Sequence, residues 1–138
     1  MKKLLLTLTL LGSSLLADTS AGEKVYQKVC ASCHIQMMTP SEAKENLKNM
    51  KAPPMNEVSQ QLKNNIEIVD DIDDEIHRAV VVAFIKDYVL NPNLDASMCN
   101  AGAIEKFGVM PSQKGKLSAQ ELDDVAKWVY DFYIDKKF

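Results

Sequence analysis

The sequence predicts an all-α fold. Apolar residues recur at helical spacing in several segments, and two of these segments begin with a Ser-x-x-Glu capping box, at Ser20–Glu23 and at Ser118–Glu121. No alternation of apolar and polar residues is long enough to indicate a strand, and no internal repeat divides the chain.

The first half of the chain is expected to begin with a helix from Ser20 that carries Tyr26 on its apolar face and leads into residues 30–34. Two short helices are expected over residues 41–50 and 56–64. Pro53 and the Pro that follows it separate them, because proline interrupts helical hydrogen bonding.

The second half is expected to begin with a long amphipathic helix from Asp73 or a neighbouring aspartate to Asn91. Another short helix over residues 96–107 should end at Gly108, since glycine is favoured just beyond a helix. The last helix starts at Ser118. Its apolar stripe consists of Leu122, Val125, Ala126, Val129, Phe132 and Tyr133.

Residues 1–17 have the pattern of a cleavable signal peptide. A basic start with Lys2 and Lys3 is followed by an apolar run, small residues and a cleavage position after Ala17, with Ala21 as a second candidate. The run is shorter than the roughly 20 residues of a spanning helix, and no later segment is long and apolar enough. Residues 18–138 are therefore expected to form one soluble domain in the periplasm, without stable membrane insertion.

Charge argues against nucleic acid as a partner. The formal net charge is −3 for the whole chain and becomes −5 once Lys2 and Lys3 are removed, whereas nucleic-acid binding needs a basic surface. The acidic residues cluster at Asp70, Asp71 and residues 73–75. A solvated helix start explains them, with a docking patch for a basic redox partner as the alternative.

The segment Cys30-Ala31-Ser32-Cys33-His34 is the motif with the clearest chemistry. It reads C-x-x-C-H, the attachment signature of c-type haem, in which two thiols bond the haem and the histidine ligates its iron. Without His34 and the export signal, the two cysteines could equally indicate a redox dithiol or half of a zinc site.

Three cysteines are present, so Cys99 remains outside the motif. We expect it to be buried as a small hydrophobic residue without a catalytic role.

With these motifs the chain resembles class I (monohaem) cytochromes c. It shares their N-terminal helix leading into C-x-x-C-H, a Met-Pro pair late in the chain and an aromatic-rich last helix. The resemblance implies a cytochrome c-like helical fold around one covalently bound haem c, with the first and last helices crossing. The middle helical segment is enlarged relative to small members of the family, and the helix near residues 73–90 is the expected insertion.

The second axial ligand of the iron is expected to be Met110. Of the seven methionines, only Met110 stands in a loop between two helix breakers, Gly108 and Pro111, and the Met-Pro pair matches the ligand loop of the family. Met55, after two prolines, is the second candidate. His77 ranks below both, because a lone histidine on a helix is more often a surface or satisfied residue.

The imidazole of His34 also needs a partner for its second nitrogen. The resemblance implies a proline carbonyl from the loop after the motif, and both Pro40 and Pro53 are candidates.

The predicted function is a soluble periplasmic electron carrier, not an enzyme, with His34 and Met110 as iron ligands and Cys30 and Cys33 as covalent attachment points. Such a protein shuttles single electrons between a respiratory donor and an acceptor such as a terminal oxidase or peroxidase. The alternatives are a haem-bearing subunit of a larger complex, a sensor or enzyme with an open sixth position, and a thiol–disulfide module.

Overall fold

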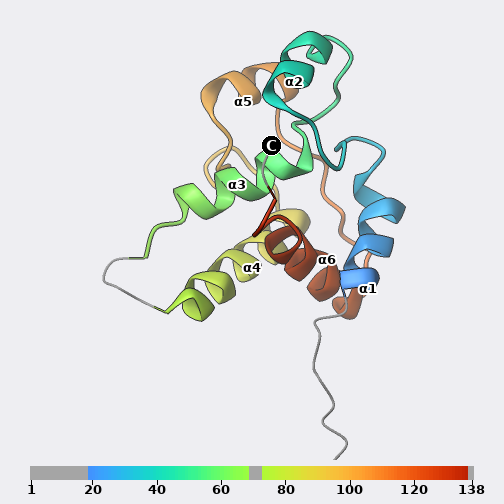
Figure 1. The fold of residues 1–138 in the computed structure, drawn as a ribbon. Coiled ribbons are helices and arrows are strands. Elements are labelled where there is room, and N and C mark those ends of the chain that lie inside the picture. The colour runs from blue at the N-terminus through green and yellow to red at the C-terminus, as the bar shows by residue number, and fades with distance from the viewer. Residues whose placement is uncertain (1–18, 69–72, 137–138) are drawn as a thin grey trace, which may run out of the picture.

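The computed structural model describes residues 19–68 and 73–136. The predicted signal peptide over residues 1–17 and the acidic residues Asp70 and Asp71 therefore lie outside the described residues. Within them the fold is all-α, without strands (Figure 1). Its elements are α1 (Thr19–Val25), a π-helical turn (Tyr26–Cys30), α2 (Pro40–Asn46), α3 (Met55–Asn65), α4 (Asp74–Leu90), α5 (Ala101–Phe107) and α6 (Ala119–Asp131).

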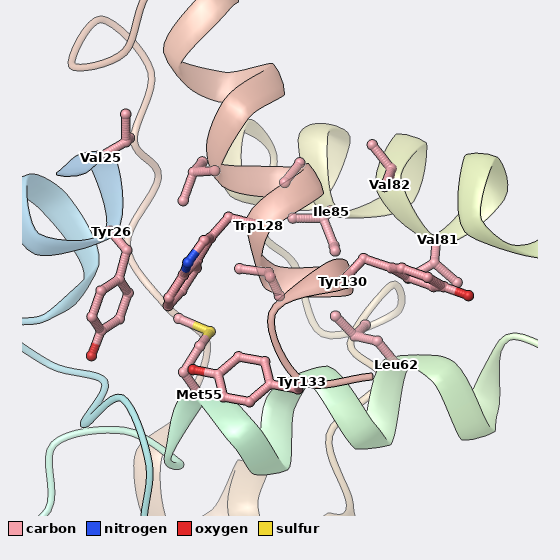
Figure 2. Packing of buried hydrophobic residues seen from close by; sticks show 13 residues of the cluster. Val25, Tyr26, Met55, Leu62, Val81, Val82, Ile85, Trp128, Tyr130 and Tyr133 are labelled. Carbon is pink, nitrogen blue, oxygen red and sulfur yellow. The ribbon is translucent and has the colours of Figure 1, made fainter. Parts of the chain in front are cut away.

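Helices α1 and α6 cross at close range, as the resemblance implied (Figure 1). The crossing depends on Gly22, because a Cβ atom there would overlap the Cβ of Trp128 and the carbonyl oxygen of Asp124. One helical turn further on, the rings of Tyr26 and Trp128 stack with centroids 4.7 Å apart (Figure 2). Both side chains are only 1% exposed, so this stack forms the centre of the core.

Helix α4 packs against α6 and buries Val81, Val82 and Ile85. Ion pairs cross the two helices between Arg78 and Asp131 and between Lys86 and Asp123. The enlarged middle segment is therefore an integral part of the fold.

Most predicted helix boundaries agree with the structure to within a few residues. The Ser118 capping box is present, Asp73 caps α4, and Asn91 ends it. Two expectations were wrong. Ser20 lies inside α1, directly after the first described residue, Thr19, and the short helix expected from residue 96 begins at Ala101 after the cap residue Asn100. The described residues include no helix long and apolar enough to cross a membrane.

Candidate haem site

A large cavity lies among α3, the last turns of α4, the C-x-x-C-H segment and the loop that follows α5. It is lined mainly by apolar side chains and is partly open to solvent. Cys30, Cys33, His34 and Met110 all line this cavity, although up to 80 residues separate them in sequence. The four predicted site residues therefore converge on one cavity.

Two turns shape the C-x-x-C-H segment, the π-helical turn that ends at Cys30 and a tight turn that follows it. In the tight turn the carbonyl of Cys30 accepts hydrogen bonds from the backbone N–H groups of Cys33 (3.1 Å) and His34 (2.9 Å). Such π-turns are frequent at functional sites because they change which side chains share a face. The tight turn brings both cysteines and His34 to the cavity wall.

The state of Cys30 argues against a dithiol redox site. Burial, together with the neighbouring Cys33, raises the pKa of the Cys30 thiol to about 11. A thiol–disulfide module needs a thiolate at neutral pH, which requires a lowered pKa.

His34 has its ring orientation fixed by Pro53. The Nδ1 atom lies 2.8 Å from the carbonyl oxygen of Pro53. A carbonyl can only accept, so Nδ1 carries the proton and the lone pair is left on Nε2. Burial lowers the pKa of His34, which favours the neutral imidazole that ligates metals. Of the two candidate prolines, the structure therefore selects Pro53, while Pro40 begins α2.

The backbone after His34 is held by two buried tyrosines. The Tyr26 hydroxyl donates to the carbonyl of His34, and the Tyr133 hydroxyl donates to the carbonyl of Gln36 at 2.7 Å. The backbone N–H of Met55 donates to the carbonyl of Ile35 at 2.8 Å. Sequence reasoning assigned the two tyrosines only to helix packing. Their periodic positions gave no signal of these hydroxyl contacts.

The cavity wall also includes the loop with Met110. This half-buried residue follows Gly108, which ends α5 with a positive φ of 68°, and precedes a turn at residues 114–116. The Ser112 hydroxyl and the Gln113 backbone N–H donate to the carbonyls of Leu90 and Val89 at the end of α4. These two residues were missed, because nothing in the local sequence indicates contacts with a helix more than 20 positions earlier.

Two further methionines, Met55 and Met98, line the same cavity. Met55 is only 5% exposed and packs in the core beside Tyr133 and Trp128 (Figure 2). It is thus both core and cavity wall. Met37 is 48% exposed and lies outside the cavity lining.

His77 is satisfied without a metal. Its Nδ1 lies 2.9 Å from the Tyr130 hydroxyl, and its Nε2 lies 3.0 Å from the carbonyl oxygen of Ile66. Because the Ile66 carbonyl only accepts, Nε2 donates to it, and Nδ1 accepts from Tyr130. The structure thus joins His77 to α3 and α6, away from the cavity lining.

Cys99 differs from its expected environment. It is exposed and lies along the rim of the cavity next to Met98, whereas burial as a small hydrophobic residue was predicted. The loop between α4 and α5 follows the surface, and burial of a single cysteine depends on such tertiary placement more than on its type.

The residues present fit a haem. The cavity wall is mainly apolar, with Phe84, Val125 and Val129 among its members, as a macrocycle requires. The wall carries one imidazole, three thiols and three thioethers. The imidazole of His34 and the thiols of Cys30 and Cys33 have the spacing of the attachment motif.

Comparison with known proteins gives the same family. Residues 17–129 match the family described as cytochrome c oxidase, cbb3-type, subunit III. The chain belongs to this cytochrome c family. The prediction of a class I cytochrome c with an all-α fold is confirmed, and the family assigns haem binding and haem-based electron transfer to the chain.

A relative from Aquifex aeolicus (strain VF5), described as an uncharacterized protein, is 35% identical over 144 residues. The alignment covers 96% of this cytochrome and 89% of the relative. No solved structure matches the chain.

Proposed function

We propose that this cytochrome is a periplasmic electron carrier, not an enzyme, with one haem c attached to Cys30 and Cys33. His34 and Met110 are the proposed axial ligands of its iron. The observation that carries the proposal is the convergence of these four residues on one largely apolar cavity. The pattern of residues 1–17 supports export, followed by function as a soluble domain of residues 18–138.

In this proposal the haem supplies reversible one-electron chemistry, and the chain tunes it. Pro53 holds the proton of His34 on Nδ1 and so directs Nε2 toward the iron. A thioether ligand from Met110 raises the reduction potential, and the apolar wall excludes water from the metal. With His34 and Met110 both bound, the iron would offer no free position to a substrate.

Optical spectra of the exported, haem-loaded protein test the ligand set. We expect a c-type pyridine haemochrome and a weak far-red band in the oxidised state that is lost in Met110→Ala. Met98→Ala is the matched control, because Met98 lines the same cavity but should leave the band intact. Loss of the band in Met55→Ala or Met98→Ala alone would contradict Met110 ligation, and a high-spin wild-type spectrum would indicate an open-site sensor or enzyme.

The proposed partners are an upstream respiratory donor and an acceptor such as a terminal oxidase or peroxidase. A second candidate is a haem-bearing subunit of an oxidase complex, which the name of the family suggests. The apolar side chains of Ile76 and Val80 on α4, 49% and 42% exposed, favour this alternative because assembly interfaces bury such residues. Gel filtration of gently solubilised membranes separates the two. A free carrier elutes at the mass of the monomer, and a subunit elutes with its complex.

A further inference from the structure

The loop that carries Met110 is fastened to the C-terminal end of α4. The Ser112 hydroxyl donates to the carbonyl oxygen of Leu90 at 2.6 Å, and the backbone N–H of Gln113 donates to that of Val89 at 3.0 Å. The last four carbonyls of a helix have no partner within it. Ser112 and Gln113 therefore satisfy two acceptors that α4 leaves free, and the loop gains a fixed attachment.

On its other side the same loop is fixed at the end of α5. The backbone N–H of Gly108 donates to the carbonyl of Ile104 at 2.8 Å, which closes the helix. Met110 thus stands two residues after one fixed point, Gly108, and two residues before the other, Ser112. So short a span leaves the backbone of Met110 few alternative conformations, and Pro111 within it restricts them further.

The side chain of Gln113 stiffens the segment next to Met110. Its amide nitrogen Nε2 donates to the carbonyl of Pro111 at 2.6 Å, and its Oε1 accepts from Nζ of Lys116 at 3.2 Å. Gln113 is 8% exposed and lines the cavity, so water competes little for these bonds.

We propose that Ser112 and Gln113 are positioning residues for the sixth ligand. By attaching the Met110 loop to α4 they hold the thioether at the iron and keep the sixth position closed to small exogenous ligands. This inference rests on the proposed ligation by Met110. It explains why Met110 stays bound, which the identity of the ligand alone does not explain.

Imidazole binding to the oxidised, haem-loaded protein is the test, because imidazole binds iron only when Met110 has left. Its apparent affinity therefore scales with the fraction of open sites. Ser112→Ala removes the attachment to Leu90, together with the bond that the hydroxyl accepts from the backbone N–H of Lys114, and we expect the apparent affinity for imidazole to rise about fivefold. Ser112→Thr keeps the hydroxyl and should restore the wild-type value. Ser41→Ala, which removes an exposed hydroxyl on α2, is the matched control and should change nothing.

Gln113→Ala provides a second, independent variant, since it removes both side-chain bonds while the backbone N–H remains. We expect it, too, to raise the affinity for imidazole. Wild-type affinity in both variants, even with a lowered melting temperature, would overturn the positioning role and leave only a structural one. The spectrum of Met110→Ala is a separate readout. If its far-red band survives, the proposed ligand is wrong whatever the two variants show.

Discussion

Gly22→Ala tests whether the crossing of α1 and α6 is as close as the structure shows. A methyl group at this position would overlap the Cβ of Trp128 and the carbonyl oxygen of Asp124. Neither atom can move without shifting α6 itself. Overpacking of this kind costs about 3 kcal/mol, and the higher helix propensity of alanine offsets about 1 kcal/mol of that.

The expected net loss is about 2 kcal/mol in the free energy of unfolding, which lowers the melting temperature by about 8 °C for a domain of this size. Far-UV circular dichroism of the haem-loaded protein measures it. Gly102→Ala is the matched control, because the nearest atom to its added Cβ is Asn100 Oδ1 at 3.5 Å, an ordinary contact. That variant should melt at or above the wild-type temperature. If Gly22→Ala does the same, the helices do not approach as closely as described.

Three further predictions concern charge, hydrogen bonding and the haem. Hydrogen bonds from Lys28 and from the cap of α6 lower the pKa of Glu121 to about 2 from its usual 4.5. Its charge thus stabilises the fold fully above pH 4.5 and progressively less as the pH falls toward 2. Glu121→Gln, which preserves the capping geometry, should lower the melting temperature at pH 6 and match wild type near pH 2; equal melting at pH 6 would refute this. His77→Leu leaves two polar groups unsatisfied, so we expect a loss of about 2 kcal/mol by denaturant titration with an unchanged far-red band. A changed band would give His77 a role at the iron. Replacement of Cys30 and Cys33 by alanine should leave a poorly folded chain by circular dichroism, because the cavity would lose the haem that on the proposed attachment fills it; a native helical spectrum would contradict that.

The sequence predicted those parts of the site that are local in the chain. Cys30, Cys33 and His34 form a contiguous motif, and Met110 is marked by the breakers on either side of it. The helices with strong periodicity, α4 and α6, were also predicted closely. In each case the determining residues lie within a few positions of one another, so a single-sequence pattern contains the information.

The remaining features depend on contacts between distant segments. Pro53 and not Pro40 orients His34, because the segment leading into α3 lies beside the C-x-x-C-H turn. Ser20 belongs to a capping motif by sequence but lies inside the helix, since a cap signal is only a weak preference that flanking residues can override. The exposure of Cys99 follows from the path of the loop after α4, which no periodicity describes.

The two sides of the cavity are held in different ways, and this difference bears on function. On the His34 side, a buried tyrosine hydroxyl and the Pro53 carbonyl fix both the backbone and the ring of the ligand. On the Met110 side, the fixed points are the end of α5, the exposed hydroxyl of Ser112 and the backbone N–H of Gln113. Exposed hydrogen bonds open more readily than buried ones, so the methionine should be the ligand that leaves first. Under the proposed ligation, loosening the end of α4 is the route by which the iron would acquire an open site.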